Sequence, residues 1–371
     1  MQIMESGKFD KYQYAAEIAN QTLNKAKELC QQKQKASYIC TFCDTFMKEN
    51  LDKNYKKLSK GIGLPTCLSI NNIVAHDSYT EDDDYQIKDN DIIRIELACY
   101  IDSNVSSVGD TIKIGDEKWE ENELMIAAKK ALEVGIKAIK PDLLVSEYQN
   151  NIKKVGKCFN LNVVERPKVF HEMDTKILYD WCFLDNDNFN EPSWVVKYDH
   201  ELELEDHEVS EDEISKGEKF TVGEAYHLSV AFTKSNKVTI MSEKTPMIYQ
   251  NTQIRYSLKS KYARELISYV NKNYETECFK ISNVNMSKVH AKIGLKECLA
   301  RGVIRSLGLT ECRNNDVVIL KCSIVIQNNS VYKLTGPKIS ETNTHPKLNE
   351  DLNNILLNSN KFNKRNDYLD F

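Results

Sequence analysis

The sequence lacks a long apolar run. No stretch approaches the roughly eighteen residues that a membrane-spanning helix needs, and the mean hydropathy is −0.52. The opening residues, MQIMESGKFDKY, contain no apolar segment suited to secretion. An excess of one charge is also missing, since 50 Lys and Arg stand against 55 Asp and Glu, a net charge of −5. These absences exclude a membrane partner and a uniformly basic nucleic-acid binder, but they permit a local basic face.

A regular cysteine framework is missing as well. The eleven cysteines are scattered and odd in number, which is typical of reduced thiols in the cytosol. Cys40-x-x-Cys43 is the one close pair. A structural zinc site would need a second pair of ligands at suitable spacing, and none is evident. We therefore interpret the pair as two thiols one helical turn apart, and we expect no metal and no cofactor.

Length and pattern indicate a large α+β protein. The 371 residues exceed the size of one simple core, so the sequence predicts one large domain with an insertion, or two domains. Apolar residues at helical spacing predict helices at 12–30, 37–49, 120–140 and 145–155. Strand patterns cover 68–76, 91–101 and 105–114, and the strand at 91–101 is expected to be half-buried. This order predicts helices that cover one face of an antiparallel sheet.

The second half of the chain changes in charge. Residues 201–219 hold nine acids and two lysines, which is typical of a solvated loop. Residues 251–313 are helical in pattern and basic, with twelve Lys or Arg against five acids, a net charge of +7. An apolar strand follows at 316–327. The predicted organisation is an N-terminal extension at 1–11, a discontinuous domain at 12–250 and 314–346, a helical basic insert at 251–313, and a polar tail at 347–371.

Several separated motifs occur in an order that carries a resemblance. They are Lys60-Gly-Ile-Gly-Leu-Pro-Thr-Cys-Leu-Ser-Ile-Asn-Asn-Ile-Val-Ala-His76, Tyr85-Gln-Ile-Lys-Asp-Asn-Asp-Ile-Ile-Arg-Ile95, Lys219-Phe-Thr-Val-Gly-Glu-Ala-Tyr226, Ala291-Lys-Ile-Gly-Leu-Lys-Glu-Cys298 and Val331-Tyr-Lys-Leu-Thr-Gly-Pro337. Together they resemble the type II methionine aminopeptidase superfamily, and within it the proliferation-associated, or ErbB-receptor-binding, branch. The resemblance implies the pita-bread fold with a helical insert. Residues 159–194 are too divergent to place.

The resemblance also implies what has become of the metal site. Enzymes of this superfamily hold two divalent cations with two Asp, one His and two Glu, because several carboxylates must offset four positive charges. Carried over one by one, these ligands fall on Glu96, Ser107, His200, Ser229 and Lys321. Serine hydroxyls are poor ligands, and an ammonium group adds positive charge where negative charge is needed. We expect no working two-metal centre, and we expect Lys321 to pair with Glu96 in its place.

No catalytic residue is therefore expected. His76 takes the position of a histidine that contacts substrate in the enzymes, and without metal it is interpreted as an inherited residue that lines a vestigial pocket. The pocket set is His76, Glu96, Ser107, His200, Ser229 and Lys321. The remaining histidines show no ligand spacing, and no Gly-rich phosphate loop or Ser/His/Asp arrangement is apparent.

The basic insert supplies the functional hypothesis. In the proliferation-associated branch, this element touches ribosomal RNA beside the polypeptide tunnel exit. The cations expected to neutralise phosphates are Lys259, Lys261, Arg264, Lys292, Lys296, Arg301 and Arg305. An ordinary helix pair with a solvated lysine face is the alternative. The tail is poorer in lysine than in animal members of the branch, which weakens any role located there.

The resemblance thus implies a catalytically inactive, ribosome-associated factor. It would bind the large ribosomal subunit, through rRNA and the ribosomal proteins around the tunnel exit, and it would be a monomer off the ribosome. A role in subunit maturation, translation or dormancy is expected, in the cytoplasm or in a nuclear or nucleolar pool. Two alternatives stay open: a metal-dependent methionine aminopeptidase with a divergent site, and a peptide- or protein-binding pseudoenzyme unrelated to ribosomes.

Overall fold

A computed structural model describes most of the chain. It covers residues 6–164, 219–235, 242–274, 277–312, 316–327, 330–338 and 344–357, together with the backbone of residues 195–198, 240–241 and 358. Helices and antiparallel sheets are both present, so the predicted α+β class is confirmed. Among these residues no helix is both long and apolar enough to cross a membrane.

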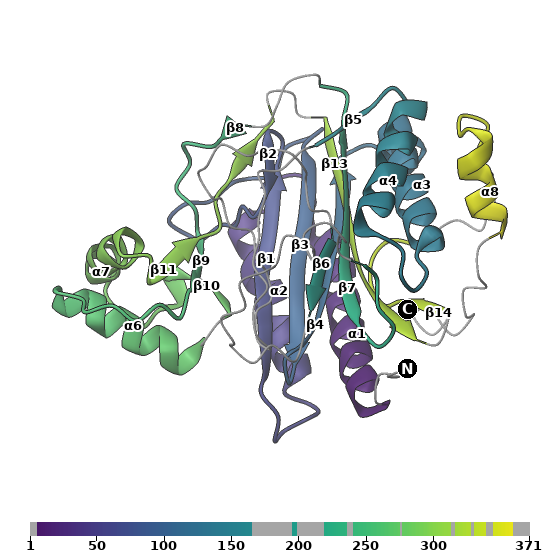
Figure 1. Cartoon of the computed structure of the whole chain (residues 1–371). Coiled ribbons are helices and arrows are strands. Elements are labelled where there is room, and N and C mark those ends of the chain that lie inside the picture. The colour runs from purple at the N-terminus through teal and green to yellow at the C-terminus, as the bar shows by residue number, and fades with distance from the viewer. Residues whose placement is uncertain are drawn as a thin grey trace.

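The centre of the molecule is an antiparallel sheet built from two parts of the chain (Figure 1). Its strands in spatial order are β1 (Lys60–Ile70), β3 (Ile92–Ile101), β4 (Asn104–Lys113), β13 (Val317–Gln327), β7 (Ala225–Thr233) and β5 (Asn162–Val163). Two further strands pair at the side, β14 (Ser330–Lys333) with β13 and β6 (Val195–Tyr198) with β7. The hairpin from β3 to β4 turns at Asp102 and Ser103, both with positive φ. Strands β4 and β13 meet in the middle, so residues distant in sequence become neighbours there.

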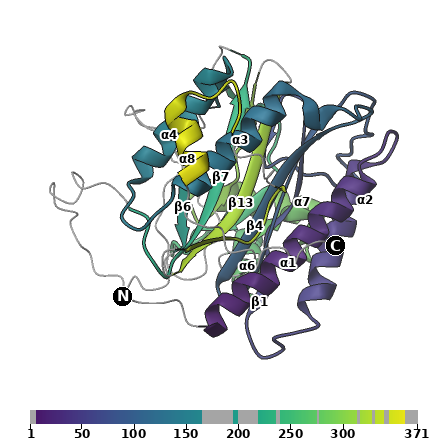
Figure 2. The ribbon, with the colours of Figure 1, turned by 90° about the vertical axis from the view of Figure 1, so that its right-hand side faces the viewer.

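Helices cover one face of this sheet (Figure 2). The β1 and β3 half packs against α1 (Ser6–Leu29) and α2 (Ala36–Leu51), whose small buried residues let the helices lie close to the strands. The β7 and β13 half packs against α3 (Glu123–Ala138), α4 (Val145–Cys158) and α8 (Glu350–Asn358). A 3-10 turn, η1 (Trp119–Glu121), precedes α3, which begins where Asn122 accepts a hydrogen bond from the Leu124 amide. Cys40 and Cys43 lie on α2, buried and free, as the sequence predicted.

The insert forms a separate lobe at the left of Figure 1. Helices α6 (Lys261–Asn273) and α7 (Lys288–Ala300) pack on a small sheet of β10 (Cys278–Lys280), β9 (Ile248–Asn251) and β11 (Ile304–Ser306), with η2 (Ile281–Asn283) between β10 and α7. Gly294 of α7 allows the two helices to approach closely, because a Cβ added there would lie 2.6 Å from the carbonyl oxygen of Tyr262 on α6. The helical prediction for 251–313 was therefore incomplete, since strands tie the helices together.

Two sequence predictions about strands are wrong. Residues 68–76 are not one strand: β1 starts at Lys60, a turn with positive φ at Asn71 follows, and β2 (Ile73–Ala75) joins another sheet with β12 (Thr310–Glu311) and β8 (Ile240–Met241). The strand at 91–101 is buried on both faces instead of one. Its polar residues have buried partners: the Arg94 guanidinium donates to the carbonyls of Asn71, Ile73 and Val317. The polar residues that alternate along this strand therefore lie on a face inside the protein and not on a face exposed to solvent.

Part of the expected polar tail is packed. Helix α8 places Leu352 and Leu356 in the core beside α3, and Lys137 Nζ donates to the Leu356 carbonyl at 3.2 Å. Residues beyond 358 lie outside the described chain.

Candidate functional site

The candidate site is a row of side chains across four neighbouring strands. In the sheet register Glu96 of β3 pairs with Gly109 of β4, Gly109 with Lys321 of β13, and Lys321 with Ser229 of β7. Cross-strand partners project from the same face of a sheet. Three of the expected ligand positions, Glu96, Ser229 and Lys321, therefore stand side by side, and all three are buried.

Lys321 and Glu96 form an ion pair at the centre of this row. Lys321 reaches Glu96 by crossing Gly109, where an added Cβ would lie 3.2 Å from both Cβ and Cδ of the lysine. The second carboxylate oxygen of Glu96 accepts the backbone N–H of His76 at 3.1 Å. Each side chain is 1% exposed, so water does not screen the pair. The predicted contact between Lys321 and Glu96 is confirmed.

A second row, two residues along the strands, contains Ser107. Its hydroxyl is hydrogen-bonded to Nδ1 of His227, and its backbone N–H donates to Ser323 Oγ at 2.9 Å. His227 was not among the predicted pocket residues. The signal for it was available, because His227 lies two positions before Ser229 on the same strand and so shares its face.

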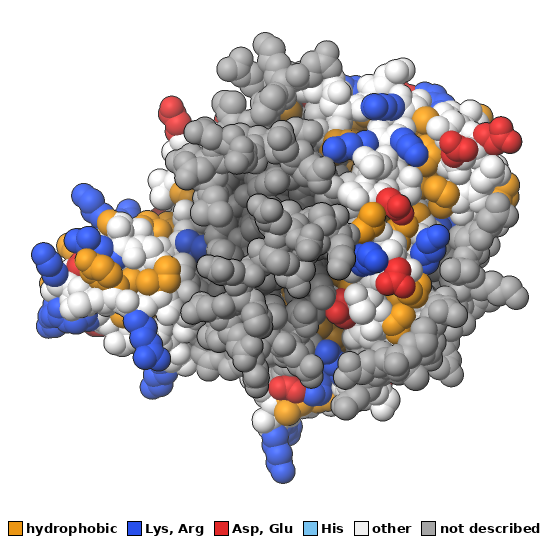
Figure 3. Space-filling model, viewed as in Figure 1, with side chains coloured by type: hydrophobic (Ala, Val, Ile, Leu, Met, Phe, Trp, Pro, Cys, Tyr) orange, Lys and Arg blue, Asp and Glu red, His pale blue; other side chains and the backbone are white. Residues whose placement is uncertain are grey.

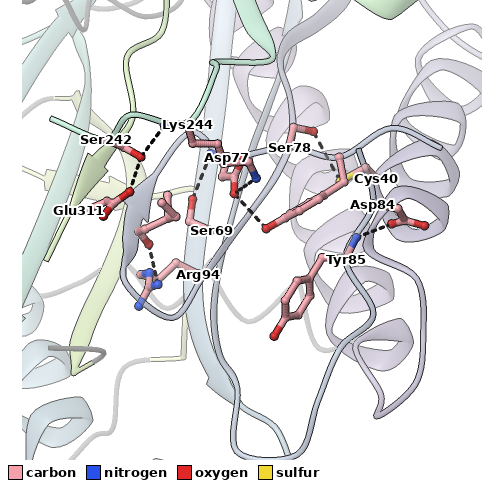
Figure 4. A network of polar contacts seen from close by, with 12 residues as sticks. Cys40, Ser69, Asp77, Ser78, Asp84, Tyr85, Arg94, Ser242, Lys244 and Glu311 are labelled. Carbon is pink, nitrogen blue, oxygen red and sulfur yellow. Dashed lines mark hydrogen bonds and ion pairs between the residues drawn. The ribbon is translucent and has the colours of Figure 1, made fainter. Parts of the chain in front are cut away.

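His76 lies in a buried turn directly after β2, with a φ of 64°. The next residue, Asp77, anchors this turn (Figure 4). Lys244 donates to both Asp77 carboxylate oxygens at 2.9 and 2.8 Å, and the Tyr79 hydroxyl donates at 2.9 Å. The Lys244 ammonium also lies 4.3 Å from the centre of the Tyr79 ring. Burial raises the pKa of Asp77, while the lysine and the tyrosine hydroxyl act in the opposite direction. These contacts fix the backbone that holds His76.

The residues present do not fit a two-metal centre. The Lys321 ammonium is bound to the one carboxylate retained from the ligand set, so a divalent cation would have to displace a buried positive charge. Serine hydroxyls stand at two other positions. The remaining ligand position, His200, lies outside the described residues. Within the described ranges, no three His, Cys, Asp or Glu side chains are grouped as a metal site requires.

The expected RNA-binding residues lie on the insert lobe. Lys259, Lys261, Arg264, Lys292, Lys296 and Arg301 are exposed, and Figure 3 shows blue side chains around this lobe. Arg305 differs: it is half-buried, and its guanidinium donates twice to Gln250 Oε1, at 3.1 and 2.6 Å. Arg264 is partly engaged, since it donates to the carbonyls of Leu258 and Lys259.

Not every cation of the insert adds to its surface charge. Lys280 is buried and paired with Asp44 of α2 at 2.7 Å. Burial alone would lower the pKa of Lys280, but the Asp44 carboxylate and nearby thiols raise it above its ordinary value. Lys288 is paired with Asp82 of the main domain. These two lysines join the lobe to the rest of the molecule.

Comparison with known proteins agrees with this arrangement. The sequence pattern of metallopeptidase family M24 matches residues 10–177. These residues therefore resemble a peptidase M24 domain. Its relatives include the ErbB-3 binding protein 1 of Arabidopsis thaliana, 26% identical over 340 residues that span 89% of this chain and 81% of the relative. The proliferation-associated protein A of Dictyostelium discoideum is 26% identical over 337 residues, 88% of this chain and 81% of that protein.

The structure agrees as well. A thermophilic Arx1 superposes with a TM-score of 0.77 at 21% identity, over 96% of this chain and all of the other. The predicted pita-bread fold is thereby confirmed, and so is the resemblance to the proliferation-associated branch. At this identity the superposition speaks for fold alone.

Proposed function

We propose that this protein is a catalytically inactive, aminopeptidase-like factor that binds the large ribosomal subunit near the polypeptide tunnel exit. The observation that carries the proposal is the ion pair between Lys321 and Glu96, two positions at which the family resemblance implies metal ligands in the enzymes. Without a metal-bound hydroxide, peptide hydrolysis by this family's chemistry has no nucleophile. A domain that keeps its scaffold in this state is best explained as a binding protein.

The cationic insert supports RNA as the partner. Six of the seven predicted cations are exposed on one compact lobe that projects from the sheet. Ammonium and guanidinium groups neutralise phosphates and release counterions, and structured RNA is recognised by shape and backbone without base-specific contacts. The resemblance to the proliferation-associated branch points to rRNA and the ribosomal proteins around the tunnel exit. The proposal includes a monomer off the ribosome, mainly cytoplasmic, that acts in subunit maturation, translation or dormancy.

Cosedimentation with purified large subunits tests the RNA contact. The variant Lys259→Glu, Lys261→Glu, Lys292→Glu, Lys296→Glu should lose binding, and each lost phosphate contact should lower the salt slope by roughly one unit. A matched control reverses four exposed lysines of the main domain instead: Lys56→Glu, Lys57→Glu, Lys154→Glu, Lys157→Glu. Both variants change net charge equally. Equal binding by the folded insert variant and the wild type would overturn the proposal.

The alternative function is aminopeptidase activity with a divergent site. The match to a metallopeptidase family supports it. A methionine-initiated peptide incubated with cobalt, manganese, iron or zinc discriminates between the two. Release of methionine that disappears in Glu96→Gln protein, which lacks the one retained carboxylate ligand, would favour the enzyme. No release with any metal, alongside retained subunit binding, would favour the proposed factor over the enzyme. A peptide-binding pseudoenzyme would neither cosediment with large subunits nor release methionine.

A further inference from the structure

Helix α7 carries apolar residues on both of its faces. Its inner face, with Ala291, Gly294, Leu295 and Cys298, is buried in the core of the insert lobe. On the outer face Val289 and Ile293, one helical turn apart, are 66% and 47% exposed. An ordinary surface helix has a polar outer face, because exposed aliphatic side chains gain nothing from water. The outer face of α7 therefore has the composition of a contact surface.

A second exposed apolar segment lies beside the C-terminal end of α7. Ile254 and Tyr256, in the chain that leads to α6, are also largely exposed. A Cβ added to Gly302, just past the end of α7, would lie 3.9 Å from Ile254 Cδ1. The Tyr256 ring lies 5.0 Å below the Arg301 guanidinium. Together with Leu299, these residues form what we call the apolar strip: Val289, Ile293, Leu299, Ile254 and Tyr256. Figure 3 shows orange side chains on this lobe among blue ones.

Charge around the strip selects the kind of partner. Helix α7 contains three lysines and one glutamate, and Lys292 and Lys296 stand on the same outer side as Val289 and Ile293. The carboxylate of Glu297 is already occupied, because it accepts the backbone N–H groups of Lys259 and Ser260 at 2.7 and 2.8 Å. The face thus offers aliphatic groups bordered by positive charge. A complementary partner has apolar residues bordered by carboxylates.

RNA alone does not account for the aliphatic residues of the strip, although the Tyr256 ring under the Arg301 guanidinium has the planes that base stacking needs. Phosphate contacts need the cations, and base stacking needs aromatic or guanidinium planes; aliphatic side chains such as Val289 and Ile293 provide neither. Burying aliphatic surface against another apolar surface is the interaction that gains free energy from them. The long stems of Lys292 and Lys296 can add to that apolar contact while their ammonium groups stay at its edge.

We propose that the apolar strip of α7 binds an acidic amphipathic helix of another protein. Its apolar residues would lie at i, i+3 or i+4, and i+7 against Val289 and Ile293, with Glu or Asp facing Lys292 and Lys296. This inference does not depend on the RNA contact proposed above, although the two surfaces share these lysines. The aliphatic side chains belong to the helix contact alone, which makes the two separable by substitution.

Fluorescence anisotropy with a synthetic probe tests the strip. The probe is a labelled helical peptide of about five turns with leucines along one face and glutamates at both edges. A peptide of the same composition, scrambled so that no apolar face forms, is its control. The full chain should bind the probe and not the scrambled peptide. Val289→Ser, Ile293→Ser should weaken binding by about tenfold or more, since both anchors are lost.

Leu357→Ser is the matched control variant, because Leu357 is 56% exposed on α8, away from the insert. It should bind the probe as the wild type does, and both variants should melt as the wild type does. Failure of the wild type to bind the probe, or equal weakening by Leu357→Ser, overturns the inference. The inference is also overturned if the Val289→Ser, Ile293→Ser variant still binds the probe but binds an RNA hairpin more weakly, because the strip would then contact RNA.

Discussion

At the scale of single residues, Gly109 and Lys321 lie side by side in the middle of the large antiparallel sheet. Gly109 pairs with Glu96 on one side and with Lys321 on the other, so the lysine must pass over β4 to reach its partner. Any side chain at position 109 would occupy that path. The ion pair thereby connects β3 to β13 across an intervening strand, and it links the two parts of the sheet that are distant in sequence.

Removing the ammonium should show what it costs to bury the Glu96 carboxylate without its cation. Lys321→Met leaves the Glu96 carboxylate buried without its cation, so the free energy of unfolding should fall by about 3–5 kcal/mol. Urea denaturation followed by tryptophan fluorescence measures this. Lys321→Met combined with Glu96→Gln should regain much of the loss, because no buried charge remains. Lys25→Met, at the exposed pair with Glu28, should cost less than about 0.5 kcal/mol. A Lys321→Met protein as stable as the wild type would contradict this account.

At the scale of elements, the insert lobe is joined to the main domain by buried polar contacts. Lys280 of β10 pairs with Asp44 of α2, and the Tyr100 hydroxyl of β3 donates to Glu277, which precedes β10. Burial raises the pKa of Glu277 from 4.5 to about 8, although Lys48 acts to lower it. The carboxyl group is therefore largely protonated near neutral pH in the folded protein.

Glu277 should make stability depend on pH. Its folded-state pKa lies above the unfolded value of 4.5, so the folded state binds more protons between the two, and stability falls as pH rises. The loss should be at most about 1.4 kcal/mol per pH unit between roughly pH 5 and pH 8. Urea midpoints across this range measure it. Glu277→Gln, which keeps an acceptor for Tyr100, should flatten the decline; an unchanged slope in this variant would assign the titration to another group.

Helix α8 offers a direct comparison of two adjacent leucines. Leu356 is fully packed against α3, whereas Leu357 faces water. Leu356→Ala should lower the free energy of unfolding by about 2–5 kcal/mol, because it leaves a cavity in the core. Leu357→Ala should change it by no more than about 0.5 kcal/mol. Thermal or urea denaturation of the two variants would show whether α8 is part of the cooperative unit. Equal effects would mean that it is not.

The sequence predicts secondary-structure elements better than it predicts contacts between residues that are distant in the chain. Helical periodicity predicted α2 to α4 closely, but it missed the first turns of α1, which begins at Ser6 inside the expected extension. The resemblance placed Glu96 and Lys321 in contact, because it depends on matched motifs. The contact between Ser107 and His227 spans 120 residues and arises only when β7 and β13 pair beside β4. The burial of Lys280 and Arg305 likewise depends on tertiary packing. A charge count over 251–313 cannot separate such buried cations from surface ones. The RNA-binding set remains a prediction.

At the scale of the whole molecule, folding should not depend on a divalent cation. Its central ion pair supplies the positive charge that a metal would bring. Chelation with EDTA should therefore leave the melting temperature unchanged, because only a ligand that prefers the folded state shifts it. Elemental analysis of the purified protein should find no stoichiometric cobalt, manganese, iron or zinc. Two equivalents of metal, or a chelator-dependent fall in melting temperature, would contradict the prediction.

The path of Lys321 over Gly109 also bears on how such a protein could change over evolutionary time. Converting the row into a metal centre needs several substitutions, and their order matters. Lys321→Glu alone would place a second buried carboxylate opposite Glu96, and a carboxylate at 229 alone would add another uncompensated charge. Each single step lowers stability before any metal can bind. Conversion of this row into a metal centre would therefore require several substitutions at once, because each one made singly leaves a buried charge without its partner.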